Sequence, residues 1–127
     1  MSGKILVVDD SALSRRTMRR ILEGAGYSVV EADEGMAALE MYFIEKPVAV
    51  LLDLVMKGMY GLDVLAKLRE MDRDARVVIA SADIQNSTRM LAEEAGACAV
   101  VNKPLVASEV IQALEKALAG GSILDTH

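Results

Sequence analysis

The 127-residue chain has the usual size of one domain, and because 53% of its residues are hydrophobic it can fill a sizeable core. Its net charge of −5 comes from interspersed acidic and basic residues, which excludes a global electrostatic attraction to nucleic acid. No window approaches the ~20 consecutive apolar residues that a membrane helix requires, so we expect no membrane partner.

Short apolar runs alternate with segments of helical spacing along the whole chain. The runs predict strands at Lys4–Val8, Tyr27–Ala32, Val48–Leu52, Arg76–Ala80 and Ala97–Val101. The segments that follow them predict helices at about residues 13–25, 34–45, 62–71, 84–95 and 106–118. Glycine or proline ends most of these segments, as helix C-termini favour.

Strict strand–helix alternation with short loops predicts a parallel sheet that is covered on both faces. The continuous apolar runs ILVV, AVLL and RVVIA are typical of strands buried on both sides. The expected fold class is therefore α/β, a doubly wound five-stranded parallel sheet of five βα units, flavodoxin-like with strand order 2-1-3-4-5. We expect one domain at residues 1–120 and a loose tail at residues 121–127.

Polar side chains stand at the predicted carboxyl ends of the strands. Asp53 ends the apolar run AVLL, where a charge costs several kcal/mol unless it is compensated. Asp9 and Asp10 follow the first strand, Ser81 ends the fourth and Lys103 follows the fifth. In the order 2-1-3-4-5, strands one and three are neighbours at the point where ligands bind. The three carboxylates should therefore line one crevice at the carboxyl ends of the strands, together with Ser81 and Lys103.

Carboxylates this close repel one another unless a cation intervenes, and Mg²⁺ prefers such oxygen ligands. Lys103 adds a point charge and Ser81 a hydroxyl donor, so the set suits attack on a phosphorus centre. Asp53 is the expected nucleophile, which would form an aspartyl-phosphate.

Each piece also has a simpler interpretation. Asp10 or Ser11 could be the N-cap of a helix that starts at Ala12, and Asp53 could be an ordinary loop acid. Ser81 and Lys103 are uninformative when taken one at a time. Their combination, each at the end of the correct strand, favours a site.

At this point the sequence resembles the receiver domain of two-component response regulators, the CheY-like family. The pieces that match, in the family's order and spacing, are ILVVDDSALSRRTMRRIL, LLDLVMKGMYGLDVLAKLR, VVIASAD and NKPL. The resemblance implies that Asp53 accepts the phosphoryl group and that Asp10 binds Mg²⁺ directly. It also implies that Asp9 acts through metal-bound water and that the Val55 carbonyl is a further metal ligand.

The same resemblance implies that Ser81 is the switch hydroxyl and that Lys103 contacts a phosphoryl oxygen. The Lys103–Pro104 bond would be the family's cis X-Pro bond. The resemblance further implies that the protein catalyses its own phosphorylation and dephosphorylation, and we expect no separate small-molecule substrate.

The chain departs from the family pattern near the predicted site. Lys57 stands where the family usually has proline, which removes a fixed φ from the loop. Val100 replaces a common Tyr or Phe, so no large ring can relocate on phosphorylation. Val55 and Asp83 would flank the phosphoryl group, where Val55 cannot orient a water and Asp83 could orient or repel one.

Three classes of function compete. The first is a stand-alone receiver, phosphorylated by a histidine kinase, whose phosphorylated form binds a downstream target. The second is a phosphorelay intermediate that passes the phosphoryl group to a histidine phosphotransfer protein, which Val100 keeps open. The third, a haloacid-dehalogenase-type phosphatase, is disfavoured because Val55 stands where it needs a second acid. Neither G-x-x-x-x-G-K-[ST] nor G-x-G-x-x-G occurs, which disfavours a nucleotide-binding module.

Two surfaces are candidates for docking a partner. The first helix carries four arginines that form either a solvated face or the docking surface of a kinase or phosphotransfer helix: Arg15, Arg16, Arg19 and Arg20. The other comprises the fourth helix, fifth strand and fifth helix, with Glu109, Glu115 and Lys116 outward. Both a monomer and a phosphorylation-dependent dimer fit the sequence.

The predicted compartment is the cytoplasm. The N-terminal MSGKILVVDD lacks the long apolar core of a signal peptide. Cys98 is the single cysteine, which rules out an intramolecular disulfide and favours a reducing environment. Within AGACAVV we expect it to be a small buried hydrophobe.

Overall fold

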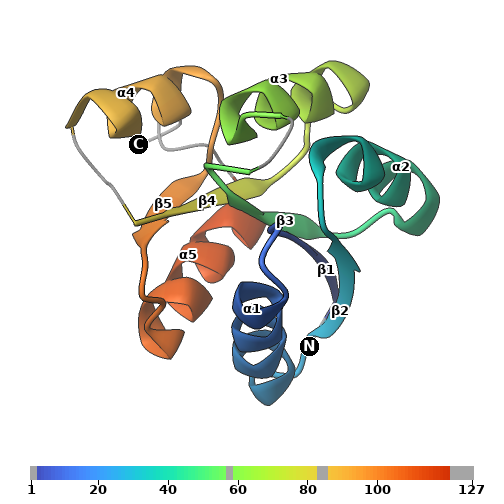
Figure 1. Ribbon diagram of the computed structural model, residues 1–127, viewed down its shortest axis with the longest axis vertical. Coiled ribbons are helices and arrows are strands. Elements are labelled where there is room, and N and C mark those ends of the chain that lie inside the picture. Colours follow the sequence, from blue (N-terminus) through green and yellow to red (C-terminus); the bar gives the residue numbers. More distant parts are fainter. Residues whose placement is uncertain (1–2, 57–58, 83–85, 121–127) are drawn as a thin grey trace.

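The computed structural model describes residues 3–56, 59–82 and 86–120, and the predicted tail at 121–127 lies outside them. Helices and strands alternate along the described chain as the sequence predicts (Figure 1). The strands are β1 (Lys4–Val8), β2 (Ser28–Ala32), β3 (Ala49–Asp53), β4 (Val77–Ser81) and β5 (Ala99–Asn102). The helices are α1 (Ala12–Gly24), α2 (Gly35–Glu45), α3 (Gly61–Met71), α4 (Asn86–Glu94) and α5 (Ala107–Leu118).

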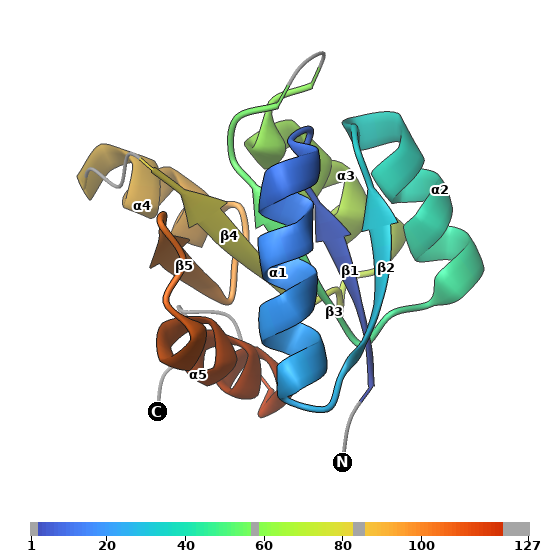
Figure 2. The ribbon, with the colours of Figure 1, turned by 60° about the horizontal axis from the view of Figure 1, so that its bottom comes forward.

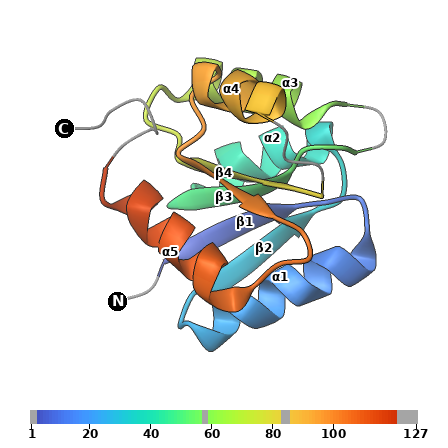
Figure 3. The ribbon, with the colours of Figure 1, turned by 90° about the vertical axis from the view of Figure 1, so that its left-hand side faces the viewer.

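The strands form one parallel sheet in the order β2-β1-β3-β4-β5, which confirms the predicted fold class. Helices α1 and α5 cover one face, and α2, α3 and α4 cover the other (Figure 3). Successive strand residues point to opposite faces, so each strand supplies both cores. In β1, Ile5 and Val7 pack toward α1 and α5, whereas Leu6 and Val8 pack toward α2 and α3. This two-sided burial explains the continuous apolar runs.

The strands β3 and β4 extend one residue beyond the predicted ends. Asp53 pairs with Ala80, and Ser81 pairs with Asn102, so both polar residues belong to the parallel ladder. An apolar run alone marks burial, whereas backbone pairing continues as long as a neighbouring strand is present. Both side chains are therefore held by rigid sheet rather than by a loop. Cys98 is buried just before β5, which confirms its prediction as a small core residue.

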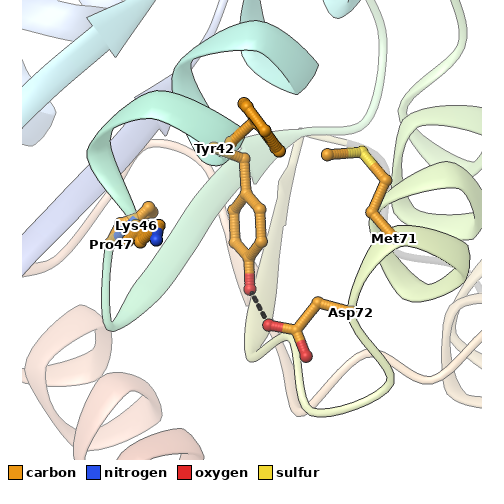
Figure 4. Close-up of a pocket in the computed structure, with 6 residues that line it drawn as sticks. Tyr42, Lys46, Pro47, Met71 and Asp72 are labelled. Atoms are coloured by element: carbon orange, nitrogen blue, oxygen red, sulfur yellow. Dashed lines mark hydrogen bonds between the residues drawn. The ribbon is translucent and has the colours of Figure 1, made fainter.

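Helices α2 and α3 meet at the end of the sheet where the strands begin. A pocket lies there, lined by Tyr42, Phe43, Lys46, Pro47, Met71 and Asp72. Figure 4 shows the Tyr42 ring pointing down to Asp72, where its hydroxyl donates a hydrogen bond of 2.7 Å to Oδ2. Hydrogen bonds from Tyr42 and from the backbone of Asp74 lower the pKa of Asp72 below its ordinary value. The bond joins the end of α2 to the residue that ends α3.

We expect Tyr42→Phe to destabilise the protein by about 1 kcal/mol at neutral pH, because Asp72 loses a charge-assisted donor. Since the pKa of Asp72 is lowered in the folded state, the stabilisation is present above its ordinary pKa of 3.8 and is lost as pH falls through the folded value. Urea unfolding at pH 7 and pH 3 should show a difference between wild type and variant that shrinks in acid. The control is Tyr60→Phe, which removes the same atom from an exposed side chain. An equal loss in both variants would contradict the prediction.

Candidate functional site

The carboxyl ends of β1 and β3 bring the three predicted carboxylates together. Asp9, Asp10 and Asp53 each offer a carboxylate oxygen, and these oxygens lie within 4.8 Å of one another. Asp9 is only 1% exposed and Asp53 only 7%, whereas Asp10 is half-buried at the mouth. The structure therefore assembles the acid cluster that the strand order predicts.

Lys103 is the positive charge of this cluster. Its Nζ lies 2.8 Å from Asp9 Oδ2 and 2.9 Å from Asp53 Oδ1, so one ammonium bridges two buried carboxylates. Burial raises the pKa of Asp53, with the negative charges of Asp9 and Asp10 adding to it, and the bond from Lys103 opposes this only in part. Burial lowers the pKa of Lys103, but its bonds to both carboxylates outweigh that effect and raise it overall. Lys103 therefore stays protonated at neutral pH.

The backbone of β4 positions Lys103. Its N–H donates to the Ser81 carbonyl at 2.9 Å, and the bond from Lys103 to Pro104 is cis, as the family resemblance implies. Ser81 itself is the buried last residue of β4, beside Asn102 of β5. Ser81 and Lys103 thus lie at the carboxyl ends of the strands, as the acids do.

The turn before α1 shows whether Asp10 or Ser11 is the N-cap of the helix. Ser11 is the N-cap: it has extended backbone, and its hydroxyl accepts the N–H of Ser14 at 3.2 Å. Asp9 Oδ1 accepts the N–H of Ser11 at 2.9 Å, which shapes the turn. Because Ser11 caps the helix, the Asp10 carboxylate is not needed there.

The loop after Asp53 is tied down from both sides. The Leu54 N–H donates to the Ala80 carbonyl at 2.9 Å, and the Leu54 carbonyl accepts the N–H of Gly61 at 2.7 Å. The Val55 side chain points to solvent and is 67% exposed. The Val55 carbonyl as a metal ligand stays a prediction, and Lys57 and Asp83 lie outside the described residues.

Two contributors to this site were not identified from the sequence. Gly61 opens α3 directly against the loop that follows Asp53: a Cβ there would lie 2.6 Å from the Asp53 carbonyl oxygen. Arg15 donates from Nη1 to the Asp9 carbonyl at 2.7 Å. The sequence had grouped Arg15 with the other arginines of α1 as one basic face. The structure corrects this: Arg15 and Arg19 are paired with acidic residues, and only Arg16 and Arg20 are exposed.

The chain matches the family model of the response regulator receiver domain over residues 5–115. It belongs to this family. The receiver domain is 37% identical to the chemotaxis protein CheY of Bacillus subtilis over 119 residues, which cover 93% of this chain and 99% of that protein. It is also 37% identical over 111 residues to the response regulator MprA of Mycobacterium bovis, covering 87% of this chain but 48% of the longer protein.

Solved structures support the same assignment. A two-component response regulator of the LuxR family from Aurantimonas sp. superimposes with a TM-score of 0.90 at 33% identity, over 96% of this chain and 89% of that chain. Receiver domains of this CheY-like kind take part in two-component signalling, interact with histidine kinases and downstream targets, and generally bind Mg²⁺ at an acidic pocket. Among the described residues, no helix is both long and apolar enough to cross a membrane.

We expect Gly61→Ala to destabilise the receiver domain by about 1–3 kcal/mol, because the added methyl must displace the backbone that follows Asp53. The matched control is Gly24→Ala in the last turn of α1, where an added Cβ meets nothing within 4 Å. There we expect a gain of about 0.5–1 kcal/mol from the better helix propensity of alanine. Chemical unfolding measures both, and a loss at Gly24 equal to that at Gly61 would contradict the steric explanation.

Proposed function

We propose that the protein accepts a phosphoryl group on Asp53 from a phosphohistidine donor in a Mg²⁺-dependent reaction, and signals by phosphorylation-dependent protein binding. The observation that carries this proposal is the buried Asp9–Lys103–Asp53 bridge at the mouth of the sheet. It brings together the Asp53 carboxylate as the nucleophile, the Lys103 ammonium as the cation and the Asp9 carboxylate as a further source of oxygen ligands.

The residues present fit a magnesium ion. Three carboxylates offer oxygens within 4.8 Å of one another, and the one ammonium described among them bridges only Asp9 and Asp53, so a divalent cation would add favourable positive charge there. All the donors are hard oxygens, as Mg²⁺ prefers. Asp10, Asp53 and the Val55 carbonyl would hold the ion directly, and Asp9 would act through its water. When bound, it would share the negative charge of the phosphoryl oxygens.

The chemistry at Asp53 follows from its position. A carboxylate oxygen of Asp53 forms a bond to phosphorus while the P–N bond to the donor histidine breaks. The electron pair of that bond stays on the imidazole nitrogen, which takes a proton from water. Lys103 is protonated and can donate to a phosphoryl oxygen, and the Ser81 hydroxyl can donate to another. In the later hydrolysis, water attacks the phosphorus, the P–O bond to Asp53 breaks with its electron pair returning to the carboxylate, and inorganic phosphate leaves with the proton lost from water passing to solvent.

The exposed part of α1 is the surface on which we expect the donor to dock. Arg16 and Arg20 are exposed, whereas Arg15 and Arg19 are held in ion pairs, and Leu13 is exposed near the carboxyl end of β1. The downstream target would use the α4, β5 and α5 surface, where Glu109, Glu115 and Lys116 are exposed.

One observation favours a second function, the phosphorelay intermediate. Val100 is 8% exposed and packs in the core beneath α3 and α4, so β5 carries no ring that could move between buried and exposed positions. A relay protein needs transfer chemistry but no strong conformational change. Transfer of label from the phosphorylated protein to a histidine phosphotransfer domain would identify it.

Incubation with acetyl phosphate and Mg²⁺ should add one phosphoryl group to the wild type and none to Asp53→Asn. Intact-mass spectrometry measures the adduct, and EDTA should abolish it in the wild type. An adduct of equal yield on Asp53→Asn would place the chemistry elsewhere and contradict the proposal. A folded wild type with no adduct would leave a phosphohistidine protein as the donor to test.

Magnesium should also stabilise the folded protein before any phosphorylation. At a concentration 100 times its dissociation constant, a ligand of the folded state adds about 2.7 kcal/mol to the free energy of unfolding. We expect this gain to be largely lost in Asp10→Asn and retained in Asp33→Asn, which removes the same charge from an exposed residue after β2. Thermal unfolding with and without Mg²⁺ measures both. Equal gains in the two variants would show that the ion is not held by the cluster.

A further inference from the structure

Arg15 of α1 contacts the backbone of the acid cluster. Its Nη1 donates to the Asp9 carbonyl oxygen at 2.7 Å, and its Nε donates to Glu31 Oε1 at 2.9 Å. Figure 2 shows α1 running alongside β1 and β2; Asp9 directly follows β1, and Glu31 belongs to β2. The guanidinium therefore joins the edge strand to the backbone of the site.

The Asp9 residue is held at every polar atom. Its N–H donates to the Ala32 carbonyl at 3.2 Å, Oδ1 accepts from the Ser11 N–H, and Oδ2 accepts from Lys103. Arg15 supplies the remaining bond, to the carbonyl oxygen. That carbonyl belongs to the rigid peptide plane whose other end is the Asp10 nitrogen. Holding the Asp9 carbonyl therefore sets the direction in which Asp10 leaves the strand.

Glu31 in turn holds the Arg15 guanidinium. Its second oxygen, Oε2, accepts from Arg19 Nε at 2.7 Å, and Arg19 also bonds Glu23 at 2.8 Å. The bond from Arg19, followed by that from Arg15, lowers the pKa of Glu31 despite its partial burial. Glu31 is thus ionised at neutral pH, and Arg15 is oriented before any ligand arrives. Such preorganisation is what a positioning group requires.

We propose that Arg15 is a positioning residue of the acid pocket: oriented by Glu31, it fixes the peptide between Asp9 and Asp10 so that Asp10 presents its carboxylate beside Asp53. The metal-binding consequence rests on the proposed function. Residues that hydrogen-bond to metal ligands and orient them typically lower metal affinity by about 10–100-fold when they are mutated.

The sign of the effect separates positioning from simple electrostatics. Arg15 carries a positive charge close to a cation site, so removing that charge alone should tighten Mg²⁺ binding. Loss of positioning should weaken it instead. Arg16 is the neighbouring residue, exposed and of equal charge, so Arg16→Met measures the electrostatic effect by itself.

The experiment compares wild type, Arg15→Met, Arg16→Met and Glu31→Gln by NMR. The first readout is the Mg²⁺ dissociation constant of the folded protein. The second is the backbone order parameter of the Asp10 amide in metal-free protein. We expect Arg15→Met to weaken Mg²⁺ binding about tenfold and to increase the mobility of Asp10. Glu31→Gln, the milder change, should act in the same direction to a smaller extent, and Arg16→Met should leave Asp10 unchanged and bind Mg²⁺ at least as tightly as wild type.

A purely structural role for Arg15 would lower the unfolding temperature but leave both readouts of the folded protein at their wild-type values, and that result would overturn the proposal. Arg15→Met with a rigid Asp10 overturns it too, whatever the Mg²⁺ affinity. If Arg15→Met does not fold, the two readouts on Glu31→Gln decide. If wild type binds no Mg²⁺, the proposed function fails, while the metal-free mobility of Asp10 still decides the role of Arg15.

Discussion

The contact on which the site depends is the Lys103 ammonium between Asp9 and Asp53. Two carboxylates that are almost completely buried carry a large desolvation cost, and only a paired charge offsets it. Lys103 follows β5, an edge strand, whereas Asp9 follows β1 and Asp53 ends β3, which are inner strands. The pair therefore links the edge of the sheet to its centre. Removing the lysine alone would leave two like charges buried, which costs more than the pair contributes.

Parallel strand register makes this meeting possible. Asp53 still pairs with Ala80 in the ladder, and the Lys103 N–H still bonds the carbonyl of Ser81. A slip of one residue would turn each side chain to the opposite face and shift it by about 3.3 Å along the strand. The apolar residues on both faces oppose such a slip, because two separate cores would lose their packing at once. Core packing thus maintains the geometry of the polar site.

The parts of this structure that could be predicted are those that alternation and strand ends determine. The strand β1 has the predicted bounds. The carboxyl ends of parallel strands lie on the same side of the sheet, and this brings together Asp9, Asp10, Asp53 and Lys103. The cap at Ser11 was one of two open choices, since Asp10 and Ser11 both have good capping side chains. The role of Gly61 could not be predicted from the sequence. A side chain at this position is excluded by the backbone of Asp53, which lies eight residues earlier in the chain.

Arg15 shows where a finer prediction was available. Arg15 and Arg19 are one helical turn apart and share a face, whereas Arg16 and Arg20 share the next one, so the spacing alone divides the four arginines into two pairs. The spacing cannot predict that Arg15 and Arg19 share Glu31, because Glu31 lies on a strand that only the fold places against α1. An exposed arginine pair can exchange partners freely, but Arg15 and Arg19 share the Glu31 carboxylate and each also donates to a backbone carbonyl, which fixes them. The same helix therefore holds two arginines in internal ion pairs on one face and exposes two arginines on the other.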